Sequence, residues 1–481
     1  MRFKILVNKW MLFLFFALAG QITFGQNASG LKSLEGSWMG PITNRGATIR
    51  LVINIGFNAS DSAIVTIDSP DQGAKGIPTS KVTYRNDSLI VEVSRLRAKF
   101  SGAIDSGLMT ITGSWKQLTF TLPLTVTRQR QKVSLLRPQE PVPPFPYRTE
   151  EVTIRNTVAG FDLSGTLTLP EGKGPFPAVV LISGSGPQNR DEEVMGHKPF
   201  LVLADYLTRK GLAVLRYDDR GIGKSGGKFQ EATTIDFATD AEAVLSFLKK
   251  HPDIDSTRAG LIGHSEGALV ASVIAAHNPQ LPFVVLMAGP GMKGENIILR
   301  QTELISRNMG ISQEVINGNI ALNQSLYEVV KKNADTAKAA SKMSALLTRF
   351  NKKHESDTTY QKISPQEIKG MIGVLNSSWF RCFLTLDPQE YLTKVRCPLL
   401  ALTGSLDLQV PADDNLKAIE SAQLIAGNPD CTVVELPGLN HLFQPAKTGG
   451  PEEYASIEQT MAPEALDTIG NWLTTLLKMK P

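Results

Sequence analysis

Apolar and polar residues alternate in short runs over about the first quarter of the chain, as in Ile49–Ile53, Ser88–Val93 and Leu118–Leu122. Residue types that form turns, such as Asn86-Asp87, separate these runs. Such alternation is typical of antiparallel strands that bury one face and expose the other. The pattern therefore predicts a small all-β domain, to which we assign residues 26–136.

The triplet Gly-Ser-Trp occurs twice in this segment, at residues 36–38 and 113–115. We expect Trp38 and Trp115 to fill the core rather than to bind a ligand, because large aromatic side chains contribute most when they are buried. The segment as a whole resembles a small lipocalin-type barrel.

Proline interrupts the alternation at the end of this segment. Five of the ten residues from Arg137 to Pro146 are prolines, and neither a helix interior nor a central strand accommodates such a run. We interpret residues 137–148 as a semi-rigid linker and place the domain boundary there.

Beyond the linker, apolar runs that suit buried parallel strands alternate with segments of helical periodicity. The predicted strands are Ala178–Ile182, Ala213–Tyr217, Ala259–Ile262, Phe283–Met287, Leu399–Leu402 and Thr432–Leu436. The predicted helices are Ala204–Lys210, Thr234–Lys250, Ala268–Ala276 and Leu466–Leu477. Repeated strand–helix units indicate an α/β fold with a doubly wound parallel sheet, which we assign to residues 149–481.

One interval, residues 291–394, breaks this rhythm. Apolar residues recur there with helical spacing, for example at Ile316, Ile320 and Leu326. A link between parallel strands needs only one helix, and this interval has room for several. We therefore predict a helical cap inserted over the carboxyl edge of the sheet. Ordinary flanking helices are the alternative.

Composition is that of a soluble globular protein, with 42% hydrophobic and 20% charged residues, and 481 residues suit two domains. The N-terminus has the features of a signal peptide over residues 1–25, because three basic residues precede or flank the apolar run Trp10–Ala19. That run is shorter than the ~20 residues that span a bilayer. We expect cleavage before Gln26, and a membrane anchor is the alternative.

Removal of residues 1–25 lowers the formal net charge from +4 to +1, since they hold three basic residues and no acid. A nearly neutral protein has no electrostatic reason to bind nucleic acid or an anionic membrane. The three cysteines, Cys382, Cys397 and Cys431, lack the spacing of a metal site and allow one disulfide at most. We therefore expect an exported protein, periplasmic or secreted, with no nucleic-acid partner, no metal and no stable membrane insertion.

The pentapeptide Gly263-His264-Ser265-Glu266-Gly267 fits G-x-S-x-G and lies between a predicted strand and a predicted helix. This context indicates a nucleophile elbow, a sharp turn that exposes a reactive serine. Glycine at both flanking positions avoids a clash where the turn brings them together. The N-terminus of the following helix directs N–H groups toward developing negative charge. We predict that Ser265 is the nucleophile of a serine hydrolase.

A serine nucleophile needs a base, because its hydroxyl is weakly nucleophilic at neutral pH. His441 lies in the loop directly after the last predicted strand, and we predict that it is this base. His264 points elsewhere from the turn, and the other four histidines lie at helix ends, before a helix or among charges: His197, His251, His277 and His354. Free imidazole titrates near pH ~6.5, so activity should rise between roughly pH 6 and 7.5.

Asp407 follows the predicted strand Leu399–Leu402 and is predicted to orient His441 and stabilise its charged form. Asp413 and Asp414 are nearby rivals, although the next helix is expected to begin at about Pro411. The order Ser, Asp, His along the chain is the order used by hydrolases with a nucleophile elbow.

An oxyanion hole needs two backbone N–H donors. The main chain of Glu266 is predicted to supply one of them. The other is expected from the loop after the first long apolar strand, at Ser185 or Gly186.

Several of these motifs together resemble a bacterial branch of the α/β-hydrolases, whose members are described as carboxylesterases or as serine-aminopeptidase-like. The resemblance covers roughly residues 150–478 and rests on Ile182–Glu192, Gly196–Phe200, Arg216–Gly221, the elbow, Trp379–Arg381 and Asp407–Pro411. It implies an α/β-hydrolase fold and ester hydrolysis by Ser265, Asp407 and His441 without a cofactor. Ser183 stands where related hydrolases often have histidine. Arg190 and Asp191 either contact substrate or brace their loop through ion pairs.

The resulting hypothesis is a serine carboxylesterase that acts on small-molecule acyl esters through an acyl-enzyme. An aminopeptidase or peptidase with the same three residues is one alternative. A ligand-binding envelope protein without catalytic activity is the other.

Overall fold

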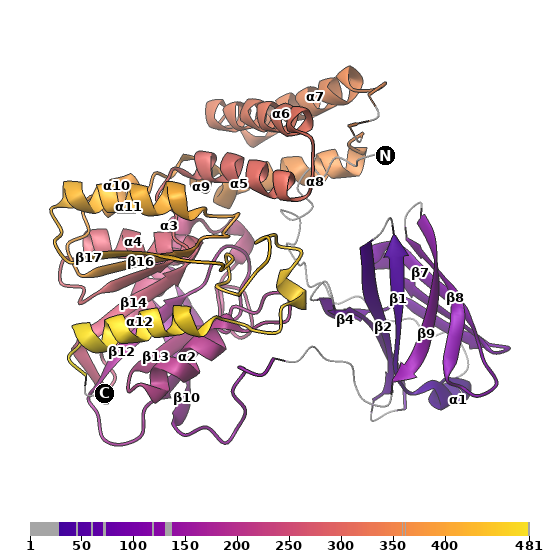
Figure 1. The fold of residues 1–481 in the computed structure, drawn as a ribbon, viewed down its shortest axis with the longest axis horizontal. Helices are drawn as coiled ribbons and strands as arrows, with labels where there is room; N and C mark the ends of the chain where they lie inside the picture. Colours follow the sequence, from indigo (N-terminus) through magenta and orange to yellow (C-terminus); the bar gives the residue numbers. More distant parts are fainter. Residues whose placement is uncertain are drawn as a thin grey trace.

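The computed structural model describes residues 28–44, 47–58, 61–70, 74–117, 120–129, 137–357, 359–360 and 362–479. The predicted signal peptide and residues Leu118 and Thr119 of one predicted strand lie outside this part of the chain. The described residues form two sheets, one of nine strands and one of eight. Figure 1 shows the two sheets as separate units within the molecule.

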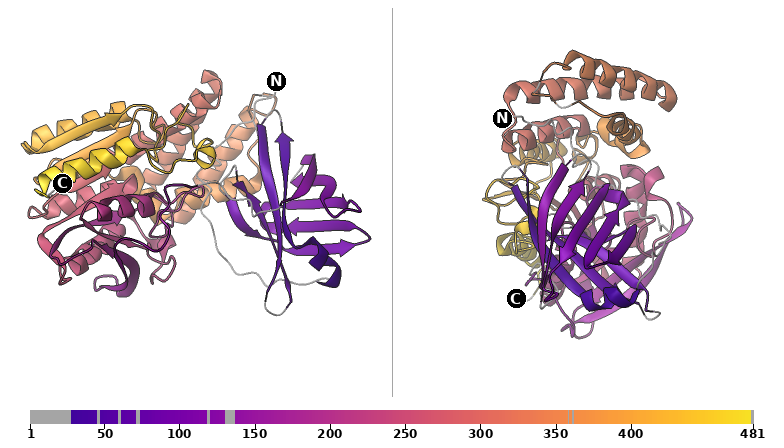
Figure 2. Two further views of the ribbon diagram at one scale, coloured as in Figure 1. Left: turned by 60° about the horizontal axis from the view of Figure 1, so that its bottom comes forward. Right: turned by 90° about the vertical axis from the view of Figure 1, so that its right-hand side faces the viewer.

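The nine-stranded sheet is antiparallel throughout, in the order β4-β3-β2-β1-β9-β8-β7-β6-β5. Its strands are β1 (Gly36–Asn44), β2 (Ala47–Phe57), β3 (Ala63–Ser69), β4 (Ala74–Pro78), β5 (Lys81–Arg85), β6 (Ser88–Val93), β7 (Ala98–Ile104), β8 (Thr110–Gln117) and β9 (Phe120–Gln129). The sheet curves into a half-barrel (Figure 2). In the described ranges no pairing closes it between β4 and β5.

The concave side of this half-barrel holds an apolar core. Trp38 and Trp115 belong to that core and are 0% and 4% exposed, which confirms their predicted burial. The short helix α1 (Ala28–Leu31) and the 3₁₀ helix η2 (Lys32–Leu34) contribute Leu31 and Leu34 to the same core.

The eight-stranded sheet has the order β10-β11-β13-β12-β14-β15-β16-β17. Its strands are β10 (Arg148–Asn156), β11 (Phe161–Leu169), β12 (Phe176–Ile182), β13 (Ala213–Tyr217), β14 (Ile254–His264), β15 (Val284–Met287), β16 (Leu399–Gly404) and β17 (Cys431–Leu436). All six predicted strands are present, and β12 to β17 pair in parallel.

The prediction of a wholly parallel sheet is wrong at one edge, where β11 runs antiparallel to both β10 and β13. Strand β10 lies outermost and is rich in charged residues, including Arg148, Glu150 and Glu151. An outer strand with one buried face gives a weaker apolar signal than the central strands do, and the sequence patterns therefore did not single it out.

Helices cover both faces of this sheet. α2 (Pro199–Arg209) and α12 (Pro463–Leu476) pack on one face, and α3 (Thr234–Leu248), α4 (Glu266–His277) and α11 (Ala412–Ala426) pack on the other. Figure 1 shows α11, α4 and α3 above the sheet. The four predicted helices are all present, and each of them ends within two residues of its predicted end.

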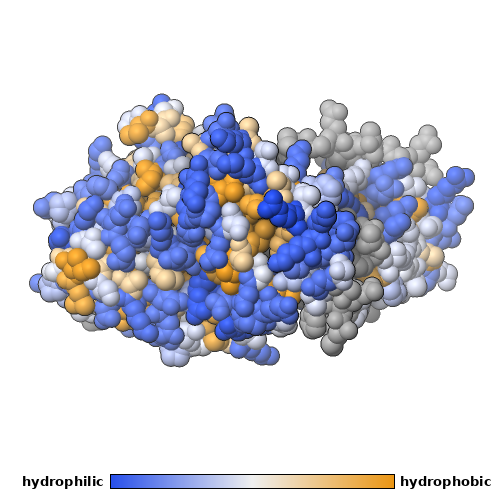
Figure 3. All heavy atoms as spheres, turned by 90° about the horizontal axis from the view of Figure 1, so that it is seen from above, coloured by the Kyte–Doolittle hydropathy of each residue, from blue (hydrophilic) through white to orange (hydrophobic). Residues whose placement is uncertain are grey.

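The interval between β15 and β16 is helical, as predicted. It holds α5 (Gly294–Asn308), α6 (Gln313–Lys332), α7 (Thr336–Lys353), α8 (Pro365–Leu375), α9 (Ser378–Thr385) and α10 (Gln389–Leu392). α5 to α9 share an apolar core with Leu269 of α4, so this cap sits over the helix that follows Ser265 (Figure 1). Seen from the cap side, the surface is mainly hydrophilic with scattered apolar patches (Figure 3).

The proline-rich linker is attached to the α/β unit where the structure describes it. The guanidinium of Arg137 donates to the carbonyls of Ala455 and Ile457, at 2.8 and 2.9 Å. The amide of Gln139 donates to the carbonyl of Met461 at 2.6 Å. These contacts hold the start of the linker beside the short 3₁₀ helix η6 (Tyr454–Ser456).

The three cysteines are free thiols, so the one disulfide that the sequence allowed is not formed. Among the helices within the described ranges, none combines the length and the apolar character that a bilayer crossing requires.

Candidate active site

The pentapeptide Gly263–Gly267 forms a sharp turn between a strand and a helix. β14 ends at His264, and α4 begins at Glu266. Ser265 between them has φ 54° and ψ −118°, a conformation that costs free energy in any residue with a side chain. Its N–H donates to the carbonyl of Met287 on β15 at 2.8 Å. The strained serine is thereby held at the carboxyl end of β14 and the N-terminus of α4.

Two glycines let the backbone pass through this turn. A Cβ atom on Gly263 would lie 2.1 Å from the carbonyl oxygen of Gly267. A Cβ atom on Gly267 would lie 2.1 Å from the carbonyl oxygen of Ile182, at the end of β12. The crowding predicted for these two positions is therefore present, and it involves backbone atoms that cannot rotate away.

We expect Gly263→Ala to lower the free energy of unfolding by about 3 kcal/mol, because the backbone has to shift to admit the methyl group. Hydrolytic activity should fall with it, and urea unfolding followed by circular dichroism measures the change in stability. Gly373→Ala in α8 is the control, since a Cβ atom there meets no atom within 4 Å and alanine favours a helix by up to about 1 kcal/mol. Equal unfolding midpoints for the two variants would contradict the steric argument.

A buried histidine–carboxylate pair lies in the loops that follow β16 and β17. Nδ1 of His441 lies 2.7 Å from Oδ2 of Asp407, and the two residues are 5% and 3% exposed. Oδ1 of the same carboxylate accepts the backbone N–H groups of Gln409 and Val410, each at 2.8 Å. Because Asp407 accepts at Oδ2, Nδ1 of His441 carries a proton and Nε2 is left to accept one.

The structure brings the loop of His441 to the edge of the sheet where Ser265 stands. The rings of His441 and His264, the residue before the serine, have centroids 4.9 Å apart. Within the described ranges no hydrogen bond is found for the hydroxyl of Ser265, and its contact with His441 stays a prediction. Hydrogen bonds of this kind are commonly long before substrate is bound.

The rival carboxylates of Asp407 have other partners. Asp413 pairs with Lys417 at 3.2 Å, and Asp414 pairs with Arg300 at 3.0 Å. Both lie in the first turn of α11, which begins at Ala412.

The loop after β12 packs directly on the candidate nucleophile. A Cβ atom on Gly184 would lie 3.2 Å from Cβ of Ser265. The N–H of Gly184 donates to Oε1 of Glu192 at 2.6 Å and is therefore occupied. In the described part of the chain, the N–H groups of Ser185, Gly186 and Glu266 have no hydrogen-bond partner, which leaves them available to an oxyanion.

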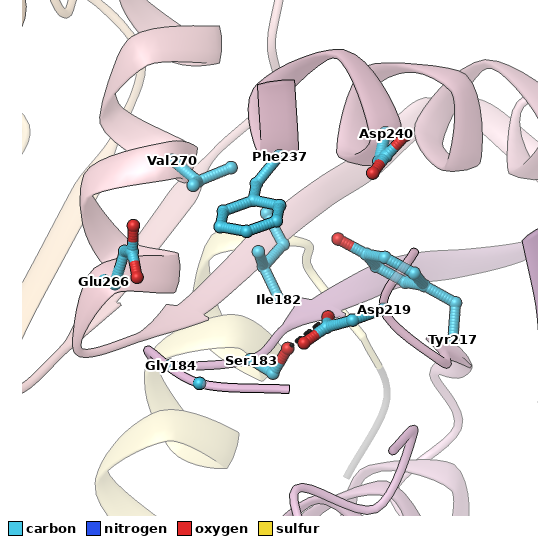
Figure 4. Close-up of a pocket in the computed structure, with 10 residues that line it drawn as sticks. Ile182, Ser183, Gly184, Tyr217, Asp219, Phe237, Asp240, Glu266 and Val270 are labelled. Carbon is cyan, nitrogen blue, oxygen red and sulfur yellow. Dashed lines mark hydrogen bonds between the residues drawn. The ribbon is translucent and has the colours of Figure 1, made fainter. Parts of the chain in front are cut away.

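Ser183, the residue that departs from related hydrolases, braces this loop from below. Its hydroxyl donates to Oδ1 of Asp219 at 2.9 Å (Figure 4), and Oδ2 of Asp219 accepts the N–H of Gln188 at 2.8 Å. Burial raises the pKa of Asp219 well above its usual range. These bonds span the loop from residue 183 to residue 188 and hold its shape without a histidine.

Glu192 and His264 form a second buried pair that the sequence patterns did not reveal. Oε1 of Glu192 lies 2.9 Å from Nδ1 of His264, and Nε2 of His264 lies 3.0 Å from the carbonyl oxygen of His441. The only signal in the sequence was the position of His264 beside the nucleophile. Glu192 comes from a loop 72 residues earlier, and no spacing rule connects the two.

The side chain of Glu266 joins the nucleophile turn to the cap. It lines a narrow pocket under the loop after β12, together with Asp219 (Figure 4). Its carboxylate accepts the hydroxyl of Thr234 at 2.6 Å and the indole N–H of Trp379 at 2.8 Å. Burial raises the pKa of Glu266 to about 7, although both hydrogen bonds act to lower it. Since Trp379 belongs to α9, this contact fixes the cap over the start of α4.

The ion-pair interpretation of Arg190 and Asp191 is the one that the contacts support. Arg190 pairs with Asp218 at 2.8 Å and with Glu151 at 2.7 Å, and Asp191 pairs with Arg216. Both residues therefore brace the loop that carries Ser185 and Gly186.

The remaining histidines have partners outside this constellation: His197 with Thr460 and the carbonyl of Tyr454, His251 with Glu150, His277 with the carbonyl of Val273 and His354 with Asp357. Across the ranges that the structure describes, no group of His, Cys, Asp and Glu side chains is arranged to hold a metal ion.

Comparison with known proteins places these residues in a family context. The family model described as serine aminopeptidase, S33, matches residues 198–444. The chain is 24% identical over 333 residues to esterase EstD of Thermotoga maritima, and the match covers 69% of each chain. It is 28% identical over 137 residues to esterase FrsA of Klebsiella pneumoniae, covering 28% of this chain and 30% of that protein. Among solved structures, esterase Pf2001 of Pyrococcus furiosus matches with a TM-score of 0.41 at 18% identity, over 68% of this chain and 93% of that one.

Proposed function

The chain belongs to the α/β-hydrolase family described as serine aminopeptidase, S33, and from this premise we propose that it is a serine hydrolase that cleaves carboxylic esters. One observation carries the proposal. A serine in strained backbone geometry stands at a helix N-terminus, and the loop beside it presents a buried histidine whose Nδ1 is bound by a carboxylate. The relatives named esterases support the choice of ester substrates.

In the proposed reaction, Oγ of Ser265 attacks the ester carbonyl while Nε2 of His441 accepts the hydroxyl proton. The new C–O bond places a negative charge on the former carbonyl oxygen. His441 then returns its proton to the departing alkoxide, and the alcohol leaves an acyl-enzyme on Ser265. Water repeats the sequence with His441 as base, so that the carboxylic acid is released and Ser265 is restored.

The negative charge on the tetrahedral intermediate is to be stabilised by backbone N–H groups. Glu266 provides one at the N-terminus of α4, and Ser185 or Gly186 provides the other. Each such donor typically contributes about 3–4 kcal/mol to lowering the barrier. Because hydrogen bonds and ion pairs within the protein, and not contacts with substrate, hold these donors in place, they need little reorganisation when the charge appears.

An aminopeptidase that uses the same three residues is the second candidate, and the description of the matched family favours it. Amides have poorer leaving groups than esters, so the two activities separate in a direct comparison. We expect kcat/KM for p-nitrophenyl acetate to exceed that for aminoacyl p-nitroanilides by about 100-fold or more, which corresponds to about 2.7 kcal/mol of barrier. A preference for the anilides would favour the aminopeptidase over the esterase.

Labelling with a fluorophosphonate probe tests the hydrolase proposal independently of substrate choice. The probe should react with Ser265 in the folded protein and fail to react after heat denaturation. An unlabelled folded protein would favour the remaining alternative, a ligand-binding envelope protein without catalysis.

Export is part of the same proposal, with residues 1–25 as the signal peptide and the mature chain starting at Gln26. The likeness of the N-terminal half-barrel to a lipocalin also stays a prediction, and among its described residues no pairing between β4 and β5 closes the sheet into a barrel.

A further inference from the structure

Glu192 and His264 connect the two loops on which the proposed reaction depends. Oε1 of Glu192 accepts the N–H of Gly184 at 2.6 Å, in the loop that carries the second candidate oxyanion donor. His264 binds Glu192 through Nδ1 and the carbonyl of His441 through Nε2. The two side chains are 4% and 6% exposed, so water does not replace these bonds. The pair thus spans the site from the oxyanion loop to the loop of the base.

The partners of His264 determine how many protons its ring carries. Nε2 faces a carbonyl oxygen, which only accepts, so this nitrogen must donate. Nδ1 faces Oε1 of Glu192, which already accepts the N–H of Gly184. The network is complete when Nδ1 donates as well, and then His264 is an imidazolium paired with a carboxylate. Loss of the Nδ1 proton breaks the link to Glu192 and turns a ring lone pair toward a negative oxygen.

The charges around His264 favour this protonated form. Burial opposes the charged ring, but the charge of Glu192, its hydrogen bond, the carbonyl of His441 and the charge of Asp407 together raise the pKa of His264. Asp219, in the loop after β13, interacts electrostatically with Glu192, and burial raises the pKa of Asp219 well above its usual range. Two further rings lie beside His264. The ring of Phe443, 6.2 Å away between centroids, carries no charge, and the ring of His441, 4.9 Å away, is the proposed base and becomes charged when it accepts a proton.

We propose that Glu192 and His264 are positioning residues, an ion pair that holds the oxyanion loop and the base loop together and limits hydrolysis at alkaline pH. This inference rests on the proposed hydrolase function. His264 touches no reacting atom and acts through the carbonyl of His441 and, by way of Glu192, through Gly184. Activity should therefore fall at alkaline pH, where His264 loses its proton and the link between the two loops is broken.

Kinetics across pH 6 to 10 test the proposal. In Glu192→Gln the amide is nearly isosteric but no longer balances an imidazolium, so His264 deprotonates earlier. We expect the decrease of kcat at alkaline pH, the alkaline limb of the pH profile, to move to lower pH by about one pH unit or more. At pH 8, kcat should fall about tenfold with KM little changed, as for one lost charged hydrogen bond. His264→Asn removes the titrating ring, and its lowered kcat should have no alkaline limb below pH 10.

Asp240→Asn is the matched control. Asp240 is also a buried carboxylate, and it pairs with Arg220 at 2.6 Å without contacting His264 or His441. This variant should lose stability and keep the pH profile of the wild type. An alkaline limb that persists unchanged in His264→Asn, or that shifts equally in Asp240→Asn, would overturn the proposal.

A measurement on the wild-type protein covers the case in which the variants do not fold. In ¹⁵N-histidine NMR spectra, one buried ring should keep both nitrogens protonated above neutral pH and titrate at the midpoint of the alkaline limb. Failure to find such a ring would contradict the inference. If Ser265→Ala hydrolyses esters normally, the proposed function itself fails, whereas a Ser265-dependent activity with an unchanged limb in Glu192→Gln rejects only the positioning role.

Discussion

Ser265→Ala should hydrolyse p-nitrophenyl acetate about 10⁴-fold or more slowly than the wild type in kcat. Without the hydroxyl no acyl-enzyme forms, and His441 has no proton to accept from the protein. The residual rate should come from the oxyanion donors and from substrate binding, which the substitution leaves in place. KM should therefore change much less than kcat, and steady-state kinetics over a range of substrate concentrations measures both.

Alanine at this position is also expected to leave the fold intact. Ser265 has a strained φ of 54°, and alanine has no larger steric demand than serine there. Ser272→Ala, on the helix that follows Ser265, is the matched control, because the hydroxyl of Ser272 is buried and donates to the carbonyl of Ala268 at 2.8 Å. It should lower stability slightly and keep activity. Equal activity of Ser265→Ala and wild type would reject Ser265 as the nucleophile.

The central part of the fold was predictable because its signals are local. Strands β12, β15 and β16 contain continuous apolar runs, and Ala213–Tyr217 was predicted with the observed bounds. The turn at Ser265 was predictable for the same reason, since a glycine two residues before and two residues after the serine, between a strand and a helix, indicates a tight turn that admits no side chain at those two positions. His441 and Asp407 then followed from their places after β17 and β16.

The contacts that shape the site were not predictable, because they join loops that are distant in sequence. Glu192 lies at φ 51° in a loop whose path depends on the ion pairs of Arg190 and Asp191. Glu266 meets Trp379 across 113 residues, and that contact depends on how the cap docks. No periodicity encodes such pairs. The hydrophobic pattern therefore predicts where the sheet lies, whereas contacts between polar side chains of different loops determine the geometry of the site.

The linker is predictable from the sequence only in part. Its prolines predicted an extended, non-helical course, but Arg137 makes its hydrogen bonds to carbonyls more than 300 residues later. Carbonyl acceptors belong to every residue, and the sequence therefore does not mark which of them a particular arginine will find.

Asp407→Asn should lower kcat by about 10⁴-fold while the protein stays folded, because it exchanges the tautomer of His441. Oδ1 of Asp407 accepts two backbone N–H groups, from Gln409 and Val410. In the asparagine variant only the amide oxygen can accept them, so its NH₂ group takes the place of Oδ2 and faces Nδ1 of His441. A donor at that position requires Nδ1 to be unprotonated. The ring proton then resides on Nε2, the atom that must accept the proton of Ser265.

The fixed orientation of its carboxylate distinguishes Asp407 from Asp413 and Asp414. Asp413→Asn is the control, because the side chain of Asp413 is 82% exposed and, among the described residues, pairs with Lys417 alone. The kcat of this variant should stay within about twofold of the wild type, as for an exposed pair worth less than about 1 kcal/mol. Steady-state kinetics and thermal unfolding of both variants provide the comparison. Asp407 is bound by two N–H groups and a histidine. If the kcat of Asp407→Asn stayed near that of the wild type, another group would have to orient His441, and the buried pair would serve stability alone.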